Sequence, residues 1–258
     1  MKELKEINKS LQKKYKKEIF SKFIRAIKDF NLVEPNDKIA VCISGGKDSF
    51  LLAKCFQELK RHNKFDFEIH YLAMNPGYSE NKLNELKNIA NYLDVPLEIF
   101  DSNIFNVVKD DPNPCFICAR MRRGCLYSKA QEMGCNKIAL GHHFNDVIET
   151  ILLNMIYNGK FSGMLPILNS DHFENMQLIR PLYYVKEKDI ISWTKYVETK
   201  FLDDVCPITT KKIGKRQEIK DLVNTLVDIY ENADINILNS MFHVNPNTTF
   251  IDKLNDKK

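Results

Sequence analysis

Long apolar runs are missing from this sequence. No segment of the 258 residues reaches the roughly 18 consecutive apolar residues that a membrane-spanning helix needs. Residues 1–20 are basic and lack the apolar stretch of a secretory signal, so we expect a cytoplasmic protein. Internal repeats and low-complexity tracts are absent as well, which favours an ordinary globular fold.

A strong charge of one sign is also missing. The formal net charge is only +4, so an anionic partner would have to bind a local basic patch. Hydrophobic residues make up 44% and charged residues 28%, as in most globular proteins. The length suits one large α/β domain with helical additions.

Two common nucleotide-binding motifs, GxxxxGK[ST] and GxGxxG, do not occur. The chain instead alternates between short apolar runs and helical spacing. Strands are predicted at residues 38–43, 67–74, 95–100, 137–140 and, as a strand or extended segment, 178–181. Helices are predicted at residues 3–31, 50–59, 80–93, 120–133, 146–157, 188–199 and 218–232. Residues 158–170 contain glycine and proline and are predicted to form a loop.

This alternation predicts an α/β fold with a parallel, twisted sheet and helices on both faces. We expect an N-terminal helical segment at residues 1–35, the α/β domain at 36–232 and a C-terminal tail at 233–258. Ligands of such sheets bind outside the carboxyl ends of the strands. Four polar segments follow predicted strands and should gather there: residues 44–49, 74–75, the loop before residue 120, and 141–143.

Residues 44–49, here called the phosphate loop, read Ser-Gly-Gly-Lys-Asp-Ser and join a strand to a helix. Gly45 and Gly46 let the backbone approach an anion closely, and the helix start offers free N–H groups. Ser44 and Ser49 add hydroxyl donors, and Lys47 adds positive charge. Asp48 can hold Mg²⁺ or cap the helix. The alternative interpretation is a glycine-rich turn before a capped helix.

The segment from Gly141 to Asp146 follows the predicted strand at 137–140. Adjacent histidines such as His142 and His143 are more often part of a polar loop than of a metal site. Their place at the same edge of the sheet as the phosphate loop favours a role in the same site.

Cys115 and Cys118 form a CxxC pair in a loop that opens a helix. Such a pair can be redox-active, bind zinc or bind an iron–sulfur cluster. The thioredoxin-like context of a redox pair is missing, and zinc usually requires four ligands. Cys206 is the only cysteine after Cys135, and three thiolates suit a 4Fe–4S cluster. Unrelated free thiols remain the alternative.

The other cysteines are predicted to have structural roles. Cys42 and Cys55 lie in an apolar strand and on an apolar helix face, and are predicted to be core residues. Cys135 follows a glycine at a helix end, and Cys125 is expected to pack within the helix after the CxxC pair.

Several motifs occur together in an order that resembles the tRNA 2-thiocytidine synthetase family of PP-loop ATP pyrophosphatases. They are Ser44–Ser49, the segment from Pro114 to Gly124 with both cysteines and Arg122-Arg123, residues 137–143, Leu152–Met155 and Ile179–Leu182. The resemblance covers roughly residues 20–225 and implies the adenine nucleotide alpha hydrolase-like fold.

The resemblance also implies the activity. Enzymes of this family adenylate a base carbonyl oxygen in tRNA and replace the oxygen with sulfur. It implies ATP binding by the phosphate loop together with Met74, Gly141, His142 and Asp146, and Mg²⁺ held by Asp48 and Asp146. Asp48, Cys115, Cys118 and Cys206 are the implied catalytic residues, the three cysteines holding the 4Fe–4S cluster.

Two positions depart from the family pattern. Asn145 stands where the first acidic residue of the GH..DD..ET motif is expected. Thr209 stands where many family members have the second cysteine of a further CxxC pair, which leaves the RNA target open. Thiolation of a uridine or another base, and a cluster-free ligase of the lysidine synthetase type, are the alternatives. A non-enzymatic RNA-binding protein with a structural metal would leave the phosphate loop unexplained.

Basic residues near the cysteines are candidates for binding RNA phosphates. They are Arg120, Arg122 and Arg123 beside the CxxC pair, and Lys211 and Lys212 after Cys206. No pyridoxal-phosphate signature is present, so we expect a separate cysteine desulfurase or other sulfide donor as partner. The family further suggests a homodimer.

Overall fold

The structure is a computed structural model that describes residues 2–62, 65–102, 104, 107, 114–202 and 214–248, with backbone alone at 114–116 and 246. Its described residues fall into two compact units, the first within residues 1–144 and 165–211, the second within 145–164 and 212–258. The domain boundaries at residues 35 and 232 stay a prediction. Among the described residues, none of the helices is both long and apolar enough to span a membrane.

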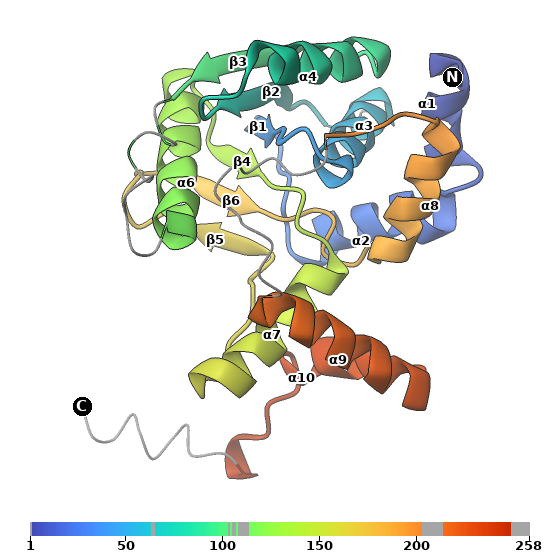
Figure 1. Cartoon of the computed structure of the whole chain (residues 1–258), viewed down its shortest axis with the longest axis vertical. Helices are drawn as coiled ribbons and strands as arrows, with labels where there is room; N and C mark the ends of the chain where they lie inside the picture. The colour runs from blue at the N-terminus through green and yellow to red at the C-terminus, as the bar shows by residue number, and fades with distance from the viewer. Residues whose placement is uncertain are drawn as a thin grey trace. The chain divides into compact units, whose positions relative to one another are not determined.

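The first unit contains a sheet in which the described strands have the order β3-β2-β1-β4-β6-β5 (Figure 1). The strands are β1 Lys38–Cys42, β2 Glu68–Asn75, β3 Leu97–Asp101, β4 Lys137–Ala139, β5 Ile167–Asn169 and β6 Gln177–Ile179. Neighbouring strands from β3 to β6 pair in parallel, which confirms the predicted parallel sheet. The prediction of a loop at residues 158–170 was wrong at β5, which pairs antiparallel with β6 at the edge of the sheet.

Helices cover both faces of this sheet, as predicted. Figure 1 shows α6, Pro114–Glu132, on one side, and α3, Lys47–His62, with α8, Glu187–Val197, on the other. Helix α4, Glu80–Tyr92, connects β2 to β3. The core beneath α6 contains Cys42, Ile138 and Leu178 from three neighbouring strands. Cys42, Cys55 and Cys135 are all buried, which confirms the prediction that Cys42 and Cys55 are core residues.

The helix predicted at residues 3–31 is interrupted. It consists of α1 Leu4–Gln12, the π-helical turn η1 Lys16–Phe20 and α2 Ser21–Asp29. Tyr15, at the interruption, is buried, and its hydroxyl donates to the carbonyl oxygen of Ser192 on α8 over 2.8 Å. The break therefore lets an aromatic side chain enter the core and fasten this segment to α8.

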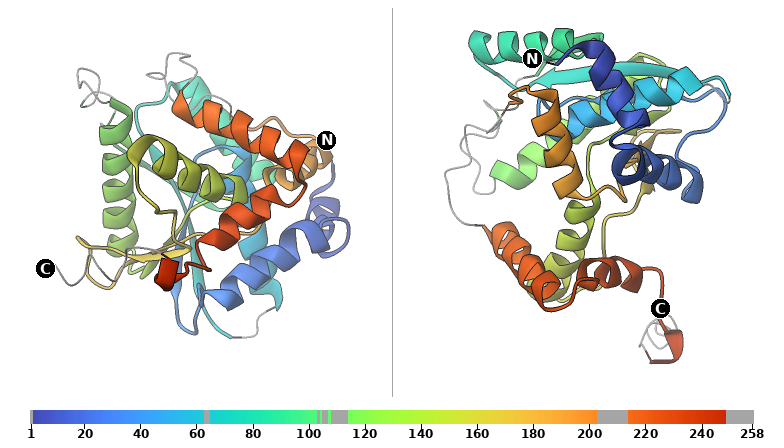
Figure 2. Two further views of the ribbon diagram at one scale, coloured as in Figure 1. Left: turned by 90° about the horizontal axis from the view of Figure 1, so that it is seen from below. Right: turned by 90° about the vertical axis from the view of Figure 1, so that its right-hand side faces the viewer.

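The second unit is helical. It contains α7 Phe144–Asn158 from residue 145 onward, α9 Lys215–Ile229, α10 Ala233–Ser240 and the 3₁₀ turn η2 Pro246–Thr248. Helices α9 and α10 pack side by side (Figure 2). Helix α10 lies within residues 233–258, the segment predicted to be a C-terminal tail. Buried Asp234 and Leu238 show that α10 packs on its neighbours.

Candidate active site

The phosphate loop is closed by its own serine hydroxyls. The backbone N–H of Ser44 donates to Oγ of Ser49 over 3.2 Å, and that hydroxyl donates to the carbonyl oxygen of Gly46 over 2.8 Å. Helix α3 begins at Lys47, three residues earlier than predicted, so Lys47, Asp48 and Ser49 form its first turn. The loop and the backbone N–H groups at the start of this helix form the kind of cradle that binds phosphate.

Gly45 is a glycine for two physical reasons. Its φ of +93° lies in the left-handed region, which strains any residue with a Cβ. A Cβ would also lie 2.5 Å from Cδ1 of Leu202. The N–H of Leu202 donates to the carbonyl oxygen of Gly45 over 3.1 Å. The chain that leaves α8 is therefore hydrogen-bonded to the phosphate loop, and the side chain of Leu202 occupies the space beside Gly45.

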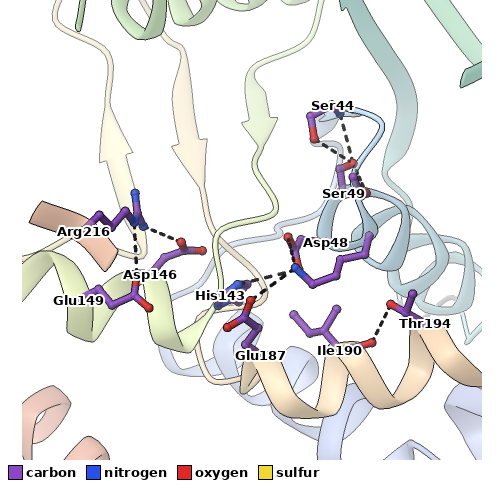
Figure 3. A network of polar contacts seen from close by, with 12 residues as sticks. Ser44, Asp48, Ser49, His143, Asp146, Glu149, Glu187, Ile190, Thr194 and Arg216 are labelled. Atoms are coloured by element: carbon purple, nitrogen blue, oxygen red, sulfur yellow. Dashed lines mark hydrogen bonds and ion pairs between the residues drawn. The ribbon is translucent and has the colours of Figure 1, made fainter. Parts of the chain in front are cut away.

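Charged side chains meet beside the first turn of α3 (Figure 3). Nζ of Lys47 lies 3.3 Å from a carboxylate oxygen of Asp48 and 3.6 Å from one of Glu187. Nε2 of the buried His143 lies 3.9 Å from Oδ1 of Asp48. Glu187 was missed by sequence reasoning, because its only signal was an acidic residue at the start of a helix. The ion pairs hold Lys47 beside the phosphate cradle.

The loop after β4 packs directly on the start of α3. A Cβ on Gly141 would lie 3.1 Å from the backbone carbon of Asp48 and from the nitrogen of Ser49. Because β1 and β4 are neighbours and their connections leave in opposite directions, both loops lie at the topological switch point, where ligands of such sheets bind. The structure thus brings Gly141, His142 and the phosphate loop together, as the sequence predicted.

Arg180 fixes the ring of His142. Its Nε donates to Nδ1 of His142 over 3.4 Å, and its guanidinium also donates to the carbonyl oxygen of Leu165. Arg180 is buried, and it follows β6 directly. With Nδ1 accepting a hydrogen bond, the proton of a neutral His142 ring lies on Nε2.

The CxxC pair lies in the first turn of α6 rather than in a loop before the helix. Pro114 is the first residue of α6, a position that suits proline because its missing N–H would be unpaired there. The buried Cys118 contacts Ile104, and Met74 from the end of β2 packs against both. Cys125 packs against the same cluster, as predicted. Met74 therefore links the end of β2 to the cysteine helix.

The residues present suit an iron–sulfur cluster. Cys115 and Cys118 are three residues apart at the N-terminal end of α6, a spacing typical of metal-ligating CxxC pairs, and a helix N-terminus stabilises thiolates. Among the side chains that the structure describes, no three His, Cys, Asp or Glu residues form a metal-binding group. The side chain of Cys115 and all of Cys206 lie outside the described residues.

Asp146 belongs to the second unit, where it forms ion pairs within the helices. Nη2 of Arg216 donates to Oδ1 of Asp146 over 2.6 Å, and Nε of Arg216 donates to Glu149 over 3.2 Å. Burial raises the pKa of the Glu149 carboxyl, and the Arg216 guanidinium partly offsets that rise. These pairs join α7 to α9.

The predicted RNA-binding arginines lie on α6. Arg120 and Arg123 are exposed, and Arg122 is half-buried. Lys211 and Lys212 lie outside the described residues.

Comparison with known proteins first identifies the protein family to which the chain belongs. A family model described as PP-loop domain matches residues 11–220, so the chain belongs to the PP-loop family. Within it, a tRNA-cytidine(32) 2-sulfurtransferase of Paraburkholderia xenovorans is 37% identical over 238 residues, 89% of this chain and 69% of that protein. The chain thus belongs to the 2-thiocytidine synthetase branch that its motifs resembled.

Two further comparisons agree. A tRNA-cytidine(32) 2-sulfurtransferase of Neisseria meningitidis is 45% identical over 183 residues, 68% of this chain. The chain spans only 55% of the length of that relative. The U34-tRNA thiolase NcsA from Methanococcus maripaludis, solved with its [4Fe-4S] cluster, has the same fold, with a TM-score of 0.70 at 20% identity. That match covers 87% of this chain and 79% of the thiolase.

Proposed function

We propose that the chain is an ATP-dependent and 4Fe–4S-dependent tRNA sulfurtransferase of the cytoplasm. It would adenylate a nucleobase carbonyl in tRNA and replace the oxygen with sulfur, with 2-thiocytidine in the anticodon loop as the first candidate product. The observation that carries this proposal is the contact of Gly141 with the start of α3, which places the loops after β1 and β4 around one phosphate cradle. The named relatives supply the substrate class.

The first step is adenylation. ATP would place its phosphates on Ser44–Ser49, with Met74, Gly141 and His142 as further contacts. The base carbonyl oxygen attacks the α-phosphorus, the bond to the β-phosphate oxygen breaks, and pyrophosphate leaves. Lys47 neutralises phosphate charge, and catalysis is mainly positioning and electrostatic stabilisation.

Magnesium is proposed to bind the carboxylates of Asp48 and Asp146. Asp48 lies in the first turn of α3, next to the cradle. Asp146 accepts a hydrogen bond from Arg216 within the second unit, so an ion at Asp146 would replace that contact.

The second step forms the carbon–sulfur bond. Sulfide, as HS⁻, adds to the activated carbon, its proton is released, and AMP leaves with the former carbonyl oxygen. Cys115, Cys118 and Cys206 would hold the cluster, which supplies an iron site able to bind sulfide. Leu202, bonded to the phosphate loop, precedes Cys206 by four residues, and four residues span at most about 14 Å. A cysteine desulfurase or another sulfide donor would provide the sulfur.

The direct test is nucleoside mass spectrometry of tRNA treated anaerobically with ATP, Mg²⁺, sulfide and the reconstituted protein. We expect 2-thiocytidine, stoichiometric pyrophosphate release, and loss of both with Asp48→Asn. Thiouridine in place of 2-thiocytidine would move the target to uridine.

Cluster dependence is tested separately by the iron content and absorption spectrum of wild type and Cys206→Ala. About four irons per chain in the wild type, lost in the variant, would support the proposed ligands. A wild-type protein that stays iron-free after reconstitution would overturn cluster-dependent thiolation and favour the cluster-free ligase. The proposed homodimer is checked by the mass of the purified protein in solution.

A further inference from the structure

A cavity lies in the first unit, between α6 and the hairpin formed by β5 and β6. Its volume is about 330 Å³. The walls include Arg120, Arg123 and Gly124 from α6, and His172 and Phe173 from the hairpin. This size is at the lower end of the range for small-molecule sites, so it suits one nucleotide better than a duplex. The hairpin was not recognised in the sequence, so neither was this cavity.

The cavity is held in shape by contacts between the two elements that form it. Tyr127 of α6 stacks on Phe173, with ring centroids 5.2 Å apart and an interplanar angle of 15°. The N–H of Phe173 donates to Oγ of Ser170 over 3.1 Å. The aromatic wall is therefore fixed, and Phe173 presents an apolar surface to the cavity.

Two guanidinium groups, of Arg120 and Arg123, and one carboxylate, of Asp171, line the cavity, so their summed charge is positive and suits an anion. Arg120 and Arg123 are three residues apart on one helix face, and both are exposed. Within the described part of the chain, no ion pair joins either guanidinium to a carboxylate. Gly124 lies beside them, and a Cβ at this position would meet no atom within 4 Å. The glycine thus keeps the cavity open between the arginines and the aromatic wall.

We propose that this cavity binds one nucleotide of single-stranded RNA next to the base that reacts, an inference that rests on the proposed function. Arg120 and Arg123 would bind its phosphate, and its base would lie against Phe173. Gly124 follows Cys118 by six residues, or about 9 Å along a helix axis. A nucleotide close to the target base in the RNA sequence can span this separation. The cavity therefore fits a neighbour of the target base.

Charge removal tests the phosphate contact. The probe is a fluorescent anticodon stem-loop RNA, titrated with the full-length protein by anisotropy at several salt concentrations. Arg123→Ala should weaken binding about tenfold and lower the salt slope by roughly 0.7–0.9, and Arg120→Ala should act alike. Lys129→Ala is the matched control, because it removes the same charge from the same helix where Lys129 pairs with Glu98.

Filling the cavity tests the base contact independently of charge. Gly124→Trp should weaken RNA binding several-fold and leave ATP binding unchanged. Gly124→Ala, the control, adds one methyl group into open space and should raise the melting temperature, because alanine favours a helix interior more than glycine does. Thermal unfolding of both variants checks that they are folded.

The outcomes separate this inference from the proposed function. If wild-type protein thiolates tRNA and binds the stem-loop, but Arg120→Ala, Arg123→Ala and Gly124→Trp retain full affinity and salt slope, the cavity does not bind RNA. If the wild type binds no RNA at all, both proposals fail. If only free AMP binding falls in the variants, the cavity is a mononucleotide site, and the RNA assignment is overturned.

Discussion

At the scale of single residues, the absence of a Cβ at Gly141 lets two loops touch. The backbone of Asp48 and Ser49 would lie 3.1 Å from a Cβ at this position, and backbone atoms cannot move aside as a flexible side chain can. We predict that Gly141→Ala displaces the start of α3 and weakens ATP binding at least about tenfold, about 1.4 kcal/mol.

Calorimetric titration with ATP and Mg²⁺ measures this effect, and thermal unfolding shows whether the variant remains folded. An unchanged ATP dissociation constant in a folded variant would mean that this close approach does not shape the phosphate cradle.

The buried thiols give a second prediction at this scale. Burial raises the pKa of Cys42 to about 12 and that of Cys135 to about 11, and it raises the pKa of the Cys55 thiol as well. Because only the thiolate reacts, alkylation of these residues at about pH 8 should be more than roughly a hundredfold slower than that of an exposed thiol.

Peptide mass spectrometry after iodoacetamide treatment of the cluster-free protein checks this. The same protein in guanidinium is the control, in which all seven cysteines should react. Rapid labelling of Cys42 in the folded protein would contradict its burial.

At the scale of elements, Arg216 connects α9 to α7 through Asp146 and Glu149. The pKa of the Glu149 carboxyl is raised, so the folded state binds this proton more tightly than the unfolded state does. The contribution of Glu149 to the free energy of unfolding is therefore lost as the pH rises through the acid range toward the pKa of this carboxyl in the folded state. Removing Arg216 should raise the pKa further and enlarge that loss.

Arg216→Met should accordingly lower the free energy of unfolding by up to about 1 kcal/mol at about pH 7.5, and by less near pH 4.5. Thermal unfolding at the two pH values measures the difference. Lys38→Met removes an exposed ion pair to Glu68 and is the control without a buried carboxylate. An equal effect of Arg216→Met at both pH values would exclude Glu149 as the cause.

Several elements could be predicted from the sequence, and others could not, for physical reasons. Strands β1, β2 and β4 are apolar runs followed by turn residues, so local pattern identifies them. Strand β5 spans three residues, and Leu168 in it is exposed. Its strand character comes from pairing with β6, which local sequence does not encode. The start of α6 was not predicted because Pro114 was assigned to the loop before the helix. In the structure, Pro114 is the first residue of α6.

At the scale of the whole molecule, the candidate site was more predictable than the surface around it. The phosphate loop and Gly141-His142 follow neighbouring parallel strands, and the position of a ligand outside such strands is a rule of the fold. Glu187 and Arg180 could not be assigned in this way. Their roles depend on how α8 and β6 pack against α3 and the loop after β4, which is a tertiary arrangement.

The packing of the single tryptophan has a practical consequence. Trp193 is fully buried on α8 and stacks on Phe201, with ring centroids 6.1 Å apart. Phe201 adjoins Leu202, whose N–H is bonded to Gly45. A rearrangement of the phosphate loop would therefore displace Leu202. This residue adjoins Phe201, whose ring contacts the indole of Trp193. Trp193 is therefore an intrinsic fluorescent probe, and its ultraviolet emission can report nucleotide binding in unlabelled protein.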